Sequence, residues 1–145
     1  MRYRFSPDSR ADGRPAGMAG MEPGELEETE LKGRGKVRAG HAGDSLVLRI
    51  DALTTQTRRF KPLVREFFRK EFRAARPVFG DYQVEILIIQ PDETRGKHDV
   101  DNVAKAILDA LTGAAFRDDV QVTKLTVEKI SGDRPRLWVR ASPRA

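Results

Sequence analysis

The sequence has no cysteine and only two histidines among its 145 residues. It can form neither a disulfide nor a thiolate metal site, and a histidine-rich zinc site is disfavoured, so any bound metal must be held by oxygen. No apolar run approaches the roughly 20 residues that cross a bilayer, and the first residues lack the apolar core of a signal peptide. We therefore expect a soluble, cytoplasmic protein with no membrane partner.

The charge balance is basic, with 27 Lys and Arg against 22 Asp and Glu, a net charge of +5 and a pI near 9.8. The first 44 residues hold eight basic and eight acidic side chains, so the whole surplus lies in the rest of the chain. A basic surface of this kind is typical of proteins that bind a polyanion. The length suits one domain with one modest core.

Residues 1–43 are rich in Gly, Pro, Arg and Glu and contain no run of branched aliphatic residues. This composition predicts a disordered or flexible N-terminal arm in front of a folded domain at residues 44–145. Two alternatives stay open for the arm: a short helix at Glu25–Leu31, and contact with a partner through Lys32–Arg38.

The sequence of the folded part predicts strands and helices in the order β-α-β-α-β-β. Apolar periodicity places a strand near 46–51, a helix at 61–75, a strand at 81–90, a helix at 100–115, and strands near 120–130 and 136–141. The second half of "DYQVEILIIQ" is apolar on both faces, which indicates a central strand. We expect an α+β fold in which two main helices pack on a small mixed sheet of about four strands. The aromatic residues assigned to packing are Phe67, Phe68, Phe72 and Trp138.

The stretch "HDVDNVAKAILDALTGAAFRDDVQV" groups carboxylates at both ends of a predicted helix: Asp99 with Asp101, and Asp118 with Asp119. Asp99, Asp101 and Lys105 each have a structural explanation when taken alone: Asp99 as a helix cap, Asp101 as a complement to the helix dipole, and Asp101 with Lys105 as an ion pair. The combination is harder to explain in this way, because crowded carboxylates raise one another's pKa unless a cation lies between them. A hard divalent ion such as Mg²⁺ suits such oxygen ligands.

The segments "DVDNVAKAILDAL" and "DDVQV" together resemble the signature of RusA-type Holliday junction resolvases, which are common in phages and prophages. The resemblance implies a RusA-like fold and a homodimer that binds branched DNA. It also implies Mg²⁺, or Mn²⁺ in its place, as the cofactor. The catalytic residues that it implies are the metal ligands Asp99, Asp101 and Asp119 and the cationic side chain Lys105. The segment "ALTTQTRRF" departs from the family's usual proline-containing turn.

The spacing of the two carboxylate pairs poses a geometric problem. A helix from Asp101 to Ala115 rises about 21 Å, whereas the four residues leading to Asp119 can return at most about 14 Å. A site within one subunit therefore needs an early end to the helix, which Gly113 would permit. The alternative is that Asp119 joins Asp99 and Asp101 of a partner subunit in a two-fold dimer.

A line of basic residues beside the apolar stripe of the first helix predicts a DNA-binding surface, because arginine binds phosphate oxygens through forked donors. The alternative is an ordinary solvated face. The residues assigned to DNA binding are Arg58, Arg65, Arg69, Arg73, Arg76 and Lys97. His98 is assigned to a loop, with contact to a metal-bound water or a phosphate as the alternative.

The resemblance and the charge pattern together indicate a Mg²⁺-dependent endodeoxyribonuclease that resolves Holliday junctions by paired symmetric nicks during DNA recombination and repair. Two alternatives belong to other classes: a non-catalytic DNA-binding or interaction protein, and a nuclease for flaps or replication forks. A synthetic four-way junction incubated with Mg²⁺ or with EDTA would separate these possibilities.

Overall fold

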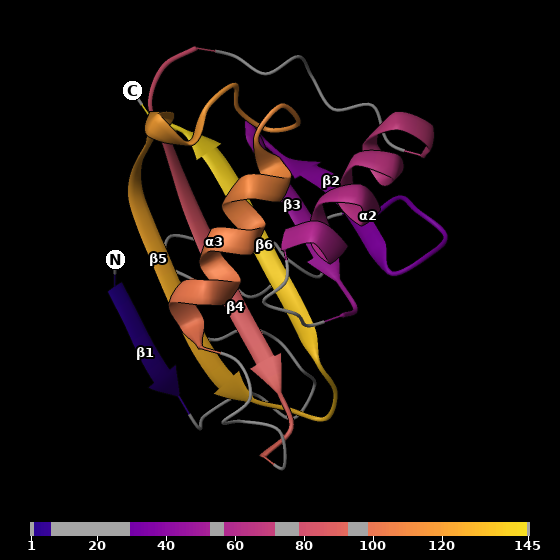
Figure 1. Cartoon of the computed structure of the whole chain (residues 1–145), viewed down its shortest axis with the longest axis vertical. Helices are drawn as coiled ribbons and strands as arrows, with labels where there is room; N and C mark the ends of the chain where they lie inside the picture. Colours follow the sequence, from indigo (N-terminus) through magenta and orange to yellow (C-terminus); the bar gives the residue numbers. More distant parts are fainter. Residues whose placement is uncertain (1, 7–29, 53–56, 72–78, 93–98, 145) are drawn as a thin grey trace.

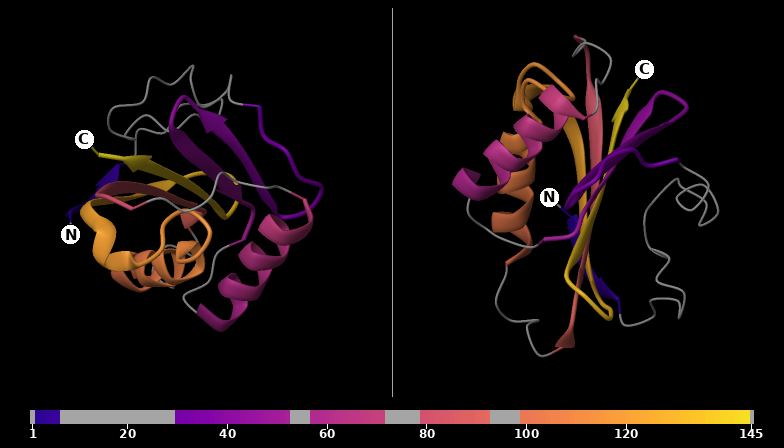
Figure 2. Two further views of the ribbon diagram at one scale, coloured as in Figure 1. Left: turned by 90° about the horizontal axis from the view of Figure 1, so that it is seen from above. Right: turned by 90° about the vertical axis from the view of Figure 1, so that its right-hand side faces the viewer.

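The computed structural model describes residues 2–6, 30–52, 57–71, 79–92 and 99–144. In these ranges six strands form one mixed sheet in the order β1-β5-β4-β6-β3-β2. Two α-helices lie side by side on one face of this sheet (Figures 1 and 2). The α+β class and the packing of both helices on a mixed sheet confirm the sequence prediction.

The strands are β1 (Arg2–Ser6), β2 (Val37–Ala42), β3 (Ser45–Ile50), β4 (Tyr82–Gln90), β5 (Val122–Ser131) and β6 (Arg136–Pro143). The helices are α2 (Thr57–Lys70), α3 (Val100–Leu111) and the short 3₁₀ turn η2 (Asp119–Gln121). Strand β5 is parallel to both of its neighbours, β1 and β4. The pairs β4–β6, β6–β3 and β3–β2 are antiparallel.

Strand β4 lies between β5 and β6 and is buried along nearly its whole length. This central position is the one that its two apolar faces predict. Because β4 and β5 are parallel neighbours, the chain must return between them, and α3 makes this crossover. The helix therefore runs back from the end of β4 towards the start of β5 (Figure 1).

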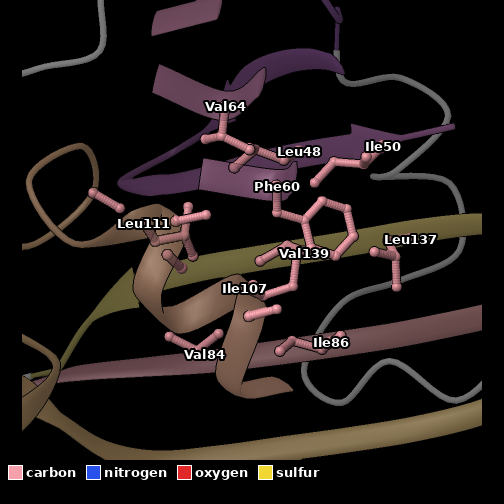
Figure 3. Close-up of a cluster of buried hydrophobic side chains, with 14 of the residues drawn as sticks. Leu48, Ile50, Phe60, Val64, Val84, Ile86, Ile107, Leu111, Leu137 and Val139 are labelled. Atoms are coloured by element: carbon pink, nitrogen blue, oxygen red, sulfur yellow. The ribbon is translucent and has the colours of Figure 1, made fainter. Parts of the chain in front are cut away.

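The main core fills the space between the helices and the sheet. Figure 3 shows side chains of α2 and α3 meeting apolar residues of three strands. Its members include Phe60 and Val64 of α2, Ile107 and Leu111 of α3, and Leu48, Ile86 and Val139 of the sheet. A smaller apolar cluster on the opposite face of the sheet contains Val47, Leu87, Ile89, Ile130 and Trp138.

The sheet has six strands where the sequence predicts about four. The two additional strands, β1 and β2, lie in the stretch assigned to the N-terminal arm. Strand β2 pairs with β3, and its Val37 and Ala39 are buried against the main core. Its sequence "VRAGHA" has only one branched aliphatic residue, so its own strand propensity is low. Pairing with β3 is what makes this segment a strand.

The helices differ from prediction at their ends. Helix α2 begins at Thr57 rather than Lys61, so Pro62 lies inside the helix and Phe60 becomes a core residue. Helix α3 ends at Leu111 rather than Ala115, and Gly113 adopts a positive φ of 90°. That backbone conformation favours glycine and lets the chain leave the helix early. Within the described residues, neither helix has the length and apolarity needed to cross a membrane.

Candidate active site

The first carboxylate pair lies at the start of α3. Asp99 occupies the N-cap position but makes no capping hydrogen bond, and its Oδ2 atom lies 3.5 Å from the Asn102 side-chain nitrogen. Asp101 accepts a hydrogen bond from the backbone N–H of Asn102 at 3.1 Å. Both carboxylates are exposed, and the start of the helix dipole favours their negative charge. This pair is therefore accessible and largely uncommitted to the fold.

Lys105 follows Asp101 by one helical turn and is exposed. The sequence alternative of an Asp101–Lys105 ion pair is not realised among the salt bridges of the described chain, although the two residues stand at the spacing that such pairs use. The lysine is thus held on the side of the helix that carries Asp101 without being neutralised by it. It can offer its charge to a ligand.

The second carboxylate pair lies in the hydrogen-bonded loop that follows α3. Asp118 caps η2 by accepting the backbone N–H of Val120 at 3.0 Å, and the Gln121 side chain completes a capping box. The side-chain Oε1 atom of Gln121 accepts hydrogen bonds from the backbone N–H groups of Arg117 and Asp118 at 2.8 and 3.0 Å. Its amide nitrogen donates to the Gly80 carbonyl at 2.8 Å, which ties η2 to the residues before β4.

These bonds give the two acids of the pair different chemistry. The backbone N–H of Val120, followed by a hydrogen bond with Asp119, lowers the pKa of Asp118. The same hydrogen bond with Asp118 raises the pKa of Asp119, and desolvation and the charges of Asp118 and Asp109 add to the rise. Asp118 therefore acts as a structural cap, whereas Asp119 is a crowded carboxylate that a cation would relieve.

The two pairs lie at opposite ends of α3. The ten residues from Asp101 to Leu111 rise about 15 Å along the helix, and Asp119 follows beyond that end, at the start of β5 (Figure 1). The early end of α3 does not bring Asp119 back to Asp99. Across the described ranges, no group of three or more Asp, Glu or His side chains is placed to hold one metal ion.

The predicted DNA-binding residues are only partly described. Arg65 is exposed on α2. Arg69 is also exposed, and it forms an ion pair with Glu66 at 2.9 Å, which matches part of its charge. Arg73, Arg76, Lys97 and His98 lie outside the described residues, and the side chain of Arg58 does as well.

Two exposed apolar side chains mark the Asp119 end of the molecule. Phe79 is 77% exposed and Val120 is 78% exposed, and the guanidinium of Arg117 lies 4.3 Å from the centre of the Phe79 ring. Neither residue was identified from the sequence. Gln121 was matched only as part of the motif, and no sequence signal shows that its amide joins two loops.

Comparison with known proteins identifies one family. The model of the family described as endodeoxyribonuclease RusA matches residues 32–141. This span is well over half of the chain and contains both carboxylate pairs, Lys105, strands β2 to β5 and the first six residues of β6. No curated protein matches the chain.

Proposed function

The chain belongs to the RusA endodeoxyribonuclease family, a family of Holliday junction endonucleases, and from that premise we propose a Mg²⁺-dependent nuclease that resolves four-way DNA junctions by paired nicks. The observation that carries the proposal is the pair of exposed, uncommitted carboxylates Asp99 and Asp101 beside an unneutralised lysine. A phage or prophage setting, with a role in recombination and repair, fits the same family.

The carboxylates suit a hard divalent cation, because Asp99, Asp101 and Asp119 offer exposed oxygen ligands that the fold engages only in local hydrogen bonds. When bound there, Mg²⁺ or Mn²⁺ would activate a water molecule and compensate charge on the scissile phosphate. Asp118 is excluded from this set, since its Oδ1 atom already caps η2. Asp119 must give up any proton it holds before it can act as a ligand.

Lys105 contributes the positive charge of the chain itself. Its ammonium group is free to approach the phosphate that Asp101 helps to position, because no carboxylate of the described chain forms a salt bridge with it. Charge that develops on the phosphate in the transition state is then stabilised by a preorganised cation.

A homodimer with a shared site accounts for the separation of the two acidic ends. In a two-fold arrangement with antiparallel α3 helices, the Asp119 end of one subunit lies beside the Asp101 end of the other. The exposed Phe79 and Val120 support this arrangement, since a partner at the Asp119 end would cover them. The two-fold axis would also place one active site at each of the two junction strands that are nicked.

The nuclease assignment is tested with a labelled four-way junction and a linear duplex of the same sequence, each with Mg²⁺ and with EDTA. We expect Mg²⁺-dependent paired nicks in the junction, loss of nicking in Asp101→Asn, and little cleavage of the duplex. Junction binding without nicking under every condition would instead favour a non-catalytic DNA-binding protein. Flap and fork substrates in the same assay would reveal a preference for those structures.

The shared site is tested with purified heterodimers carrying two different affinity tags. An Asp101→Asn subunit paired with an Asp119→Asn subunit keeps one intact site if the site is shared, and keeps none if each subunit has its own. The reciprocal control pairs a subunit that carries both substitutions with a wild-type subunit. This heterodimer keeps no intact site if the site is shared, and keeps one if each subunit has its own. Activity in the control heterodimer alone would show that each subunit builds its own site.

A further inference from the structure

The face of the sheet turned away from both helices carries several arginine side chains beside the single tryptophan of the sequence. Arg38 of β2 is the cross-strand neighbour of Arg49 of β3, and Arg49 is the neighbour of Trp138 of β6. Cross-strand neighbours share a face of the sheet. Asp51 joins the group through Arg49 and Arg136. We refer to these five residues as the arginine cluster.

The cluster has more positive than negative charge. Asp51 lies 3.4 Å from Arg49 Nη2 and 2.6 Å from Arg136 Nε, so one carboxylate serves two guanidinium groups and Arg38 adds a third cation. Burial lowers the pKa of Arg49; Asp51 opposes this, while Arg136 and Arg38 lower the pKa further. The neighbouring Arg140 adds nothing to the surplus, because it is matched by Glu85.

The cluster also contains hydrogen-bond donors that have no acceptor. Arg38 Nε, Arg49 Nε and Trp138 Nε1 are all buried and without a partner, and Trp138 is only 8% exposed. Nearly all buried polar groups in native proteins have a hydrogen-bond partner, and leaving one without a partner costs free energy. Because all three orphaned atoms are donors, the missing partner is an acceptor.

The edge of the arginine cluster is open to a ligand. The side chains of Arg49, Asp51 and Arg136 are 21%, 28% and 24% exposed, so the cluster is open at its edge although the three donors are covered. Phosphate is the acceptor that suits it best, since guanidinium groups bind phosphate oxygens through charged, forked hydrogen bonds.

We propose that the arginine cluster binds a backbone phosphate of the DNA substrate. This inference rests on the proposed function for the identity of the substrate. Both helices cover one face of the sheet (Figure 2), whereas the cluster lies on the other face with Trp138. A duplex arm held at the cluster therefore differs from the one at the carboxylates. A four-way junction supplies several such arms, whereas a linear duplex does not. The cluster therefore contributes to the preference for branched DNA.

The single tryptophan makes the test direct, because all tryptophan emission comes from the cluster. The full-length protein is titrated in EDTA with a four-way junction and with a linear duplex. We expect the emission of Trp138 to change saturably with the junction. Arg49→Gln should weaken junction affinity about tenfold and reduce the slope of log affinity against log salt by about one.

Matched variants separate a phosphate contact from a loss of fold or of net charge. Arg144→Gln removes the same charge from an exposed residue outside the cluster, and it should bind as the wild type does. Trp138→Phe keeps an aromatic ring but removes the N–H donor, and it should weaken junction binding several-fold in a gel-shift assay. Melting curves of each variant verify that it is folded.

The outcomes distinguish this inference from the proposed function. Unchanged Trp138 emission and equal junction affinity for folded Arg49→Gln would overturn the phosphate site, while junction nicking would still support the nuclease. Failure of the wild type to bind or cleave any DNA would overturn both. An emission change with polyglutamate as large as that with the junction would identify an acidic peptide site and overturn the assignment to DNA.

Discussion

The two ends of α3 carry similar carboxylate pairs that the fold treats in opposite ways. Asp99 and Asp101 are exposed and largely uncommitted, although one of them occupies an N-cap position. Asp118 and Asp119 share a hydrogen bond, and Asp118 and Gln121 hold the loop around them. A signature that reads as one motif in the sequence therefore contains an open, chemically available end and an end built around a structural cap.

The largest effect expected at the open end is that of Asp101→Asn. It should reduce junction nicking by about a thousandfold, because a ligand for the proposed cation is lost while the side chain keeps its size. The melting temperature should hardly change, since Asp101 supports the fold only through a local bond to the Asn102 N–H. Stopped-time nicking assays and thermal melts measure the two quantities.

Asp133→Asn is the control, because Asp133 is an exposed aspartate in the turn between β5 and β6. A large drop in the melting temperature of Asp101→Asn, but not of Asp133→Asn, would contradict the separation of chemistry from stability at this end of α3.

Lys105→Ala should reduce nicking by about a hundredfold, a loss typical of removing one preorganised charge from a transition state. Because Lys105 forms no ion pair in the described chain, folding should be unaffected. We expect the rate constant to fall under saturating junction, with a small change in junction affinity. A loss confined to affinity would show that Lys105 only binds DNA, and Lys105→Arg should recover part of the rate.

The arrangement of the open end was predictable from the sequence because it depends on residues that are close along the chain. The spacing of Asp99, Asp101 and Lys105 along one helix fixes their relation, and the apolar period of α3 fixes which side they occupy. The fold class followed in the same way, from strands and helices with clear periods. Strand β2 could not be predicted, since its order comes from pairing with β3 rather than from its own composition.

The other end depends on contacts between distant residues, which a sequence pattern does not show. Nothing in "DDVQV" indicates that Gln121 reaches the Gly80 carbonyl, 41 residues away. The arginine cluster is hidden for the same reason, because Arg38, Arg49 and Trp138 meet only through the register of three strands. The position of Asp119 far from Asp101 was foreseeable from helix length, but the choice between a tight return and a partner was not.

Gln121→Ala tests the structural role of the second end. It removes two accepted backbone hydrogen bonds and the tie to Gly80, so the melting temperature should fall by a few degrees. Nicking should fall about tenfold, because Asp119 remains present but is less well held. Gln83→Ala, a nearby half-buried glutamine of β4, serves as the comparison. Equal melting temperatures for Gln121→Ala and the wild type would contradict an anchoring role.

The smallest effect is a gain in stability from Asp119→Asn, measured without metal. Because its folded-state pKa is raised, Asp119 favours folding while it is protonated, and this contribution is lost as the pH rises through that pKa. The contribution of Asp118 to stability depends on pH in the opposite direction. Because its folded-state pKa is lowered, Asp118 favours folding above its ordinary pKa, and this contribution is lost as the pH falls.

Asparagine at position 119 stays neutral at every pH, so the variant escapes the charge repulsion that the wild type meets above the raised pKa of Asp119. We expect its melting temperature in EDTA to exceed that of the wild type by about 1 °C at pH 7, and the gain to vanish below about pH 4. The same variant should be inactive on junctions. A loss of stability at pH 7, or a gain that persists in acid, would show that Asp119 supports the fold, and the contrast between the two ends of α3 would then rest on Asp99 and Asp101 alone.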